Sequence, residues 1–190
     1  MKLLVALLHG AAASQLIFDS FAPATAGSFG TPVTREQSLG VQFRSVDFCG
    51  ASSSLEYVNF TVSTENIDNS ATWLDVALCP SKDGLPNCDS TVAPQRYPIT
   101  TIAKRIQYSW LPTKPIALQS DTRYWFVLSS NAELVNHAVI WLDGLKRFTS
   151  ANDPKKDVVT GFTTSEGGAW VADAARENRT VSSMQVVIKD

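Results

Sequence analysis

The chain has few of the residues and motifs that mark catalytic sites. It contains two histidines, His9 and His137, and no Gly-x-Ser-x-Gly sequence. Because His9 lies in the N-terminal leader described below, a Ser-His-Asp triad would have to use His137. His137 alternates with Val139 and Trp141 at the start of an apolar stretch, so we assign it a packing role. We therefore expect the protein not to be an enzyme.

The chain also has no concentrated charge and no long apolar stretch in its body. Its formal net charge is −2, and its only adjacent basic pairs are Lys104-Arg105, Lys146-Arg147 and Lys155-Lys156. A nucleic-acid binder usually carries a basic stripe, so we expect no nucleic-acid partner. No stretch after the leader reaches the roughly 20 apolar residues of a membrane-spanning helix, so we expect no membrane insertion.

One apolar run stands at the N-terminus and has the layout of a signal peptide. Lys2 precedes the apolar residues 3–8, three alanines at 11–13 offer a cleavage site, and only His9 interrupts the apolar run. We predict a signal peptide over residues 1–13, with cleavage after Ala13. This places the protein outside the cell as a secreted protein.

Three cysteines have to be interpreted in that oxidising compartment. Cys79 and Cys88 enclose a segment with two prolines and a glycine, so we favour a disulfide between them. Three single pairings remain open. In the favoured one Cys49 is a buried thiol or an intermolecular link in a homo-oligomer, and in the others it is the true partner of one of the other two.

Metal binding has weak support in the sequence. A zinc site at the cysteines would need four ligands, and one histidine is left after the leader. Asp68, Asn69 and Asp153 are candidate calcium ligands, but no calcium-loop motif surrounds them. We therefore expect neither a metal nor a cofactor.

Two sequons fit a secreted protein made in a eukaryotic host. They begin at Asn59 and Asn178. If Val58, Phe60 and Val62 face a core, the alternation of a strand turns Asn59 and Thr61 toward solvent, as a glycan requires. We predict both as candidate glycosylation sites.

Short stretches in which apolar and polar residues alternate recur along the chain, and none of ten or more residues has a helical period. We predict strands at residues 38–46, 54–63, 72–79, 97–103, 105–111, 115–119, 123–130, 137–143, 158–163 and 182–189. The number and spacing of these strands predict an all-β fold, a jelly-roll-like sandwich of two sheets, over residues 36–190. Residues 14–35 precede it as an extended lead-in with one strand near residues 16–18.

The run Thr122-Arg-Tyr-Trp-Phe-Val-Leu128 resembles a strand of the choice-of-anchor R type of β-sandwich module. The stretches 37–43, 73–78, 141–144 and 168–170 follow the order of the same family, and the resemblance covers about residues 36–190. It implies a non-catalytic extracellular module, and the family has no agreed ligand. The loop between Cys79 and Cys88 departs from the family pattern.

The aromatic residues give the best indication of a binding surface. With Leu74, Val76 and Leu78 facing inward, Trp73 and Asp75 point to the other face of their strand. Trp125 is likewise turned away from Tyr124, Phe126 and Leu128. A tryptophan beside a carboxylate suits sugar recognition, because the ring stacks on the apolar sugar face and the carboxylate binds hydroxyl groups. The alternative is that loops cover both tryptophans.

Three hypotheses for function follow. The first is a secreted module that binds glycan or a cell-surface protein through Trp73, Asp75 and Trp125. The second is a structural component of an extracellular matrix, coat or filament that assembles through strand edges or Cys49. The third is a small secreted hydrolase, which would need a cleft lined by His137 or by two carboxylates, with these candidates: Glu56, Asp75, Asp143 and Glu166. We favour the first.

Overall fold

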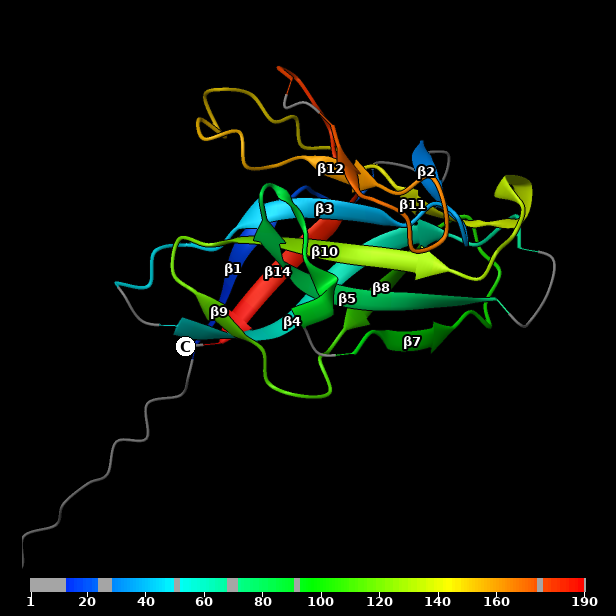
Figure 1. Cartoon of the computed structure of the whole chain (residues 1–190), viewed down its shortest axis with the longest axis horizontal. Helices are drawn as coiled ribbons and strands as arrows, with labels where there is room; N and C mark the ends of the chain where they lie inside the picture. The colour runs from blue at the N-terminus through cyan, green and yellow to red at the C-terminus, as the bar shows by residue number, and fades with distance from the viewer. Residues whose placement is uncertain are drawn as a thin grey trace, which may run out of the picture.

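The protein is a sandwich of two packed, curled antiparallel sheets, with 49% of its residues in strands and 3% in helices (Figure 1). The computed structural model describes residues 13–23, 29–49, 52–67, 72–90, 93–173 and 176–189. The predicted leader up to residue 12, and Asp68 and Asn69, lie outside these ranges. The prediction of an all-β, two-sheet fold is confirmed. In the described ranges, no helix has the length and apolar character needed to cross a bilayer.

The back sheet in Figure 1 is built around the longest strand, β4. Its strands are ordered β1 (Ser14–Asp19), β14 (Met184–Lys189), β4 (Ser52–Ser63), β11 (Val139–Leu142) and β2 (Gly30–Val33), while β8 (Ile106–Trp110) and β9 (Ala117–Gln119) also pair with β4. The lead-in expected over residues 14–35 thus contributes two strands to this sheet.

The front sheet has β3 and β10 at its centre (Figure 1). Its strands are ordered β13 (Val171–Ala172), β12 (Thr160–Phe162), β3 (Leu39–Arg44), β10 (Arg123–Ser130), β5 (Trp73–Lys82) and β6 (Leu85–Pro86), and β7 (Gln95–Pro98) pairs with β5. Most of the long strands alternate between the sheets along the chain, which is the arrangement of jelly rolls. Two 3-10 helices, η1 (Cys88–Ser90) and η2 (Val135–His137), complete the described elements.

The main core lies between the sheets and consists of the alternating apolar residues. Phe60 of β4, Phe126 of β10 and Trp141 of β11 meet there, with ring centroids 5.4 to 6.5 Å apart. All three side chains are at most 1% exposed. Burying each side chain of this size contributes about 1.5–3 kcal/mol or more.

Several strand predictions need correction at their ends. His137 lies in η2 rather than in a strand, because β11 begins at Val139. The strand expected at 97–103 is β7, which ends at Pro98, after which the Ile99 N–H donates to the Thr72 carbonyl. The expectation that Thr61 faces solvent is wrong, because it is 3% exposed and shares a small depression with Phe21 and Ala22.

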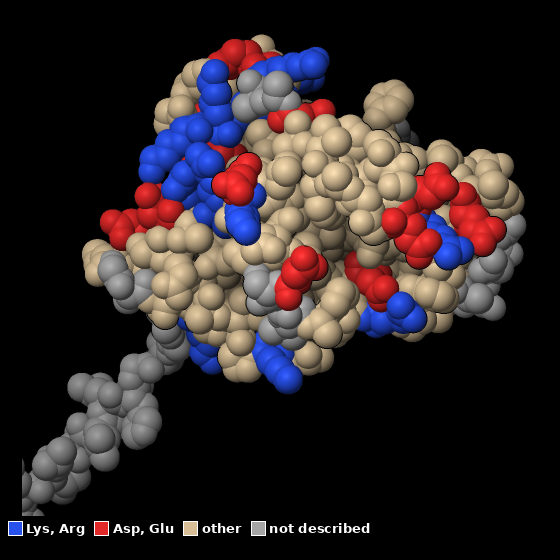
Figure 2. Space-filling view, viewed as in Figure 1, with Lys and Arg blue, Asp and Glu red and all other residues tan. Residues whose placement is uncertain are grey.

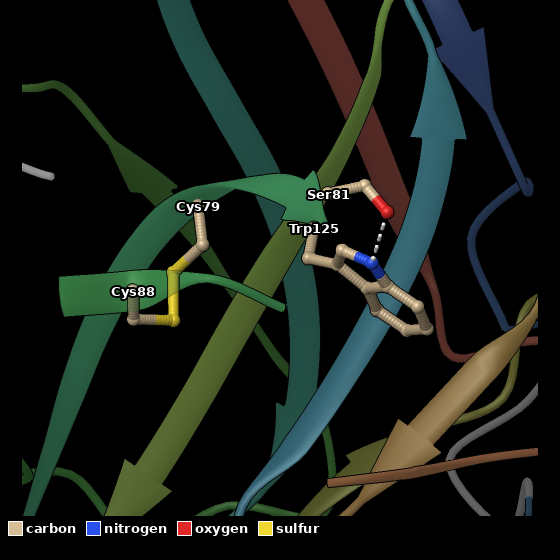
Figure 3. The surroundings of a disulfide bond; sticks show 4 residues. All are labelled: Cys79, Ser81, Cys88 and Trp125. Carbon is tan, nitrogen blue, oxygen red and sulfur yellow. Dashed lines mark hydrogen bonds between the residues drawn. A yellow bond between two sulfur atoms is a disulfide. The ribbon is translucent and has the colours of Figure 1, made fainter. Parts of the chain in front are cut away.

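The outer face of the front sheet carries a second, smaller core around Trp125 (Figure 3). Trp125 is 0% exposed and packs with Ala77, Cys79, Val127 and Val159, and Trp170 and Ala172 pack against this group. Its indole N–H donates to Ser81 Oγ at 3.2 Å. Because Trp170 and Ala172 pack against this buried indole, the segment after β12 contributes to the stability of the fold.

Two glycines make room for the Trp125 ring. Gly40 of β3 and Gly161 of β12 are paired across the sheet. A Cβ at Gly161 would lie 2.8 Å from Cζ3 of Trp125, and one at Gly40 would lie 3.1 Å from Cε3 of the same ring. The ring therefore lies on backbone that has no side chains.

The predicted disulfide between Cys79 and Cys88 is present and lies beside the Trp125 core (Figure 3). The two Cα atoms are 4.8 Å apart. Cys79 belongs to the Trp125 core and Cys88 packs against it. By loop closure alone, this bond contributes about 2–3 kcal/mol.

Replacing Gly161 with alanine should lower the free energy of unfolding by about 1–3 kcal/mol, because the new methyl group overlaps the Trp125 ring. Gly40→Ala should cost less, since its contact is looser. Chemical denaturation measures both. In a Trp125→Leu background the cost of Gly161→Ala should largely disappear, and an unchanged cost would show that the ring is not the cause.

Candidate functional site

A pocket of about 640 Å³ lies beside the Trp125 core, and both Trp73 and Asp75 line it. Figure 2 shows acidic and basic side chains gathered on the right of the molecule, near the end of β10 and the start of β5. Its other lining residues come from four further segments of the chain: Arg35, Ser38, Arg96, Ser129, Ser130, Asn131, Glu133, Glu166 and Gly167. The pocket is thus polar, with one large aromatic side chain.

Strand alternation places Trp73 and Asp75 on the outer face, as the sequence predicts. Leu74 and Val76 between and beside them are 0% exposed in the main core. Further along β5 the same outer face carries Ala77 and Cys79, which the second core covers. The pocket therefore begins where that cover ends.

Arg96 of β7 contacts the side chains of both residues. Register places it directly opposite Asp75, and its Nε and Nη2 donate to the two carboxylate oxygens of Asp75, each at 2.9 Å. The guanidinium carbon also lies 4.2 Å from the centre of the Trp73 ring. The hydrogen bond to Asp75 raises the pKa of Arg96 above its ordinary value.

A second arginine–carboxylate group forms the far wall. Arg35 Nε donates to Glu166 Oε2 at 2.7 Å, and its Nη1 lies 3.7 Å from Glu133 Oε1. The two glutamate side chains are 62% and 77% exposed. Two arginines against three carboxylates give the lining a formal charge of −1.

The end of β10 supplies the polar side of the pocket nearest Trp73. Asn131 Oδ1 accepts a hydrogen bond from the Trp73 backbone N–H at 2.9 Å, which fixes the start of β5 against the end of β10. Ser129 pairs in register with Asp75. Hydroxyl, amide, guanidinium and carboxylate groups therefore surround one indole ring.

Two of the three residues predicted to contact a ligand lie in one pocket, and the third lies outside it. Trp73 and Asp75 share the pocket, but Trp125 is fully buried and touches no solvent. The prediction that the Trp125 side chain points to the outer face is correct. The segment that covers this side chain lies elsewhere in the sequence, so the pattern of β10 alone did not reveal it. The sequence does not predict Arg96 or Arg35 at this site. Arg96 reaches the pocket through the register of β5 and β7, and Arg35 reaches it through the path of the chain after β2.

Two of the four carboxylates considered for hydrolysis, Asp75 and Glu166, line this pocket, and each is paired with an arginine. Glu56 and Asp143 are not among its lining residues. Burial raises the pKa of Asp143, which lies in an isolated bridge with Ser182. Among the described residues, no group of three or more His, Cys, Asp or Glu side chains is arranged to hold a metal ion.

The two sequons differ in their surroundings. Asn59 is half-buried in β4, where Ser109 Oγ donates to its Oδ1 at 2.6 Å. Asn178 is exposed in a turn with a positive φ of 55°. Cys49 is a free and exposed cysteine, so it is neither a buried thiol nor a partner in the disulfide.

A separate charged cluster ties the chain after β11 to the front sheet, at the upper left of Figure 2. Asp157 is 5% exposed and pairs with Arg44 Nε and, at 2.6 Å, with Arg123 Nε. Burial alone would raise the pKa of Asp157, but the hydrogen bonds and charges of the two arginines outweigh it and lower the pKa. Asp153, one of the candidate calcium ligands, is paired with Arg179 and accepts the Asp157 N–H at 2.9 Å.

Asp157→Asn should lower the free energy of unfolding at neutral pH by about 1–3 kcal/mol, because charged hydrogen bonds to two arginines are lost. The pKa of Asp157 is lower in the folded state, so its contribution is present above the unfolded value of about 4 and is lost as the pH falls through the folded value. Denaturation curves across pH should show the difference shrinking in acid. The exposed Asp121→Asn should cost less than about 1 kcal/mol, and equal costs would contradict the assignment.

Comparisons with known proteins identify no relative of this chain. No protein-family model, no curated protein and no solved structure matches it. The resemblance to choice-of-anchor R modules therefore stays a prediction, and the pocket has to be interpreted from its own chemistry.

Proposed function

We propose that the protein is a secreted, non-catalytic module that binds glycans in the pocket lined by Trp73. The observation that carries this proposal is the setting of one indole among hydroxyl, amide, guanidinium and carboxylate groups in a pocket of about 640 Å³. Sugars present an apolar face to an aromatic ring and hydroxyl groups to such polar partners. The volume lies within the range of small-ligand sites.

The location of the pocket supports the same proposal. Its residues come from β5, β7 and the end of β10, which are fixed by backbone pairing, and the chain around Glu166 is held by Thr163, whose N–H donates to the Ser38 carbonyl at 3.0 Å. A binding site supported by paired strands needs little ordering when the ligand arrives.

The arginine pairs favour binding over hydrolysis. A glycosidase needs one carboxyl group free to donate a proton and a second free to attack or to activate water. Asp75 is engaged by both donor nitrogens of Arg96, and Glu166 by Arg35. These carboxylates are therefore better placed to orient side chains and ligand hydroxyl groups than to carry out the reaction.

Secretion belongs to the proposal and is supported by the leader sequence and the disulfide between Cys79 and Cys88. Produced with its leader in a eukaryotic secretory host, the protein should leave the cell with residue 14 as its first residue and a glycan on the exposed Asn178. Intact-mass measurement after Asn178→Gln should show that glycan lost. A glycan retained in this variant would assign modification to Asn59 instead.

Trp73→Ala should reduce glycan affinity by on the order of ten-fold or more, because the stacking surface is lost. A glycan array followed by calorimetric titration of the best ligand measures the effect. Phe29→Ala, which removes an exposed aromatic ring outside the pocket, should leave affinity unchanged. Equal loss in both variants, or no binding by the wild-type protein, would contradict the proposal.

A further inference from the structure

The pocket proposed for glycans already holds a cation that belongs to the protein itself. The Arg96 guanidinium lies over the Trp73 ring at 4.2 Å and makes two hydrogen bonds to Asp75 at 2.9 Å. A ring face and a carboxylate acting together form a strong surface for cations. The contacts that Arg96 makes therefore show which chemistry this part of the pocket recognises.

The opposite wall adds further negative charge. Arg35 is shared between Glu133 and Glu166, at 3.7 and 2.7 Å. With three carboxylates and two arginines, the lining has an excess of one negative charge. An acidic sugar would meet repulsion there, whereas a positively charged sugar would complete the charge balance.

We infer that the preferred ligand of this pocket is a positively charged amino sugar, such as the glucosamine units of a deacetylated chito-oligosaccharide, and that its ammonium group replaces Arg96. This inference rests on the glycan-binding function proposed above. N-acetylation of the amine removes the charge, so acetylated oligomers are poorer ligands.

Arg96 is well placed for such an exchange. Its side chain is 58% exposed, whereas that of Asp75 is 23% exposed, so the arginine can turn into solvent while the carboxylate stays in place. β7 is a short strand of four residues that, within the described part of the chain, pairs with β5 alone. When Arg96 moves, the ring face becomes free for the sugar and Asp75 becomes free for the ammonium group.

The test is calorimetric titration of the full secreted chain with three probes of matched length. The probes are a glucosamine oligomer, the corresponding N-acetylglucosamine oligomer and a neutral glucose oligomer, in slightly acidic buffer of low ionic strength. The glucosamine oligomer should bind about ten-fold more tightly than the other two, and added salt should reduce this preference.

Pocket variants distinguish exchange with Arg96 from general attraction. Arg96→Gln should raise affinity for the glucosamine oligomer several-fold, because the internal competitor is removed, and Glu133→Gln should lower it. Arg105 and Glu65 are outside the pocket lining, so Arg105→Gln and Glu65→Gln are matched controls and should change nothing. Weaker glucosamine binding by Arg96→Gln would overturn the exchange.

The remaining outcomes separate this inference from the proposed function. If the acetylated or neutral oligomer binds at least as well as glucosamine, and Trp73→Ala abolishes that binding, the inference fails and the glycan-binding function stands. If none of the three oligomers binds, the inference fails, and the glycan array decides the proposed function separately. If the glucosamine oligomer binds equally to wild type, Trp73→Ala and Glu133→Gln, it binds elsewhere on the surface. The proposed function and the inference then both fail for this pocket.

Discussion

The burial of Trp125 on the outer face of the front sheet is the interaction on which much of this structure depends. One face of the sheet closes the main core, as in any sandwich, but β10 places a second large aromatic side chain on the opposite face. That ring needs a flat support, which Gly40 and Gly161 provide, and a cover, which Trp170 and Ala172 provide. The disulfide fixes the β5 side of the same small core.

The limited extent of this cover creates the pocket. Along β5, the outward positions are Cys79, Ala77, Asp75 and Trp73, and the first two lie in the Trp125 core while the last two line the pocket. Val127 of β10 pairs with Ala77, and Ser129 pairs with Asp75. The outward side chains of β10 therefore change from apolar to polar opposite the point where those of β5 do. The composition of two adjacent strands thus marks the border between the Trp125 core and the pocket.

The sequence predicts which way side chains point much better than what lies over them. Alternation around Leu74 and Phe126 assigns Trp73 and Trp125 to the outer face, and the local Cys79–Cys88 loop reveals the disulfide. Burial of Trp125 also depends on residues 159–172. The sequence predicts the strand at 158–163, but β13, which follows Trp170, has only two residues and carries no alternating pattern. Arg96 reaches Trp73 only through the register of β7, which no local pattern specifies. Long-range pairing therefore decided what local periodicity could not.

The segment from Thr163 to Trp170 has firm ends and an open tip. Thr163 is buried and hydrogen-bonded to Ser38 and Glu36, and Trp170 lies against Gly40. At the tip, Gly167 has a positive φ of 61°, and no atom lies within 4 Å of the place where a Cβ would be. Evolution can therefore change the length and charge of the tip, which carries Glu166, without disturbing the ends that protect Trp125. Changes at this tip should therefore alter the lining of the pocket while the two-sheet framework stays the same.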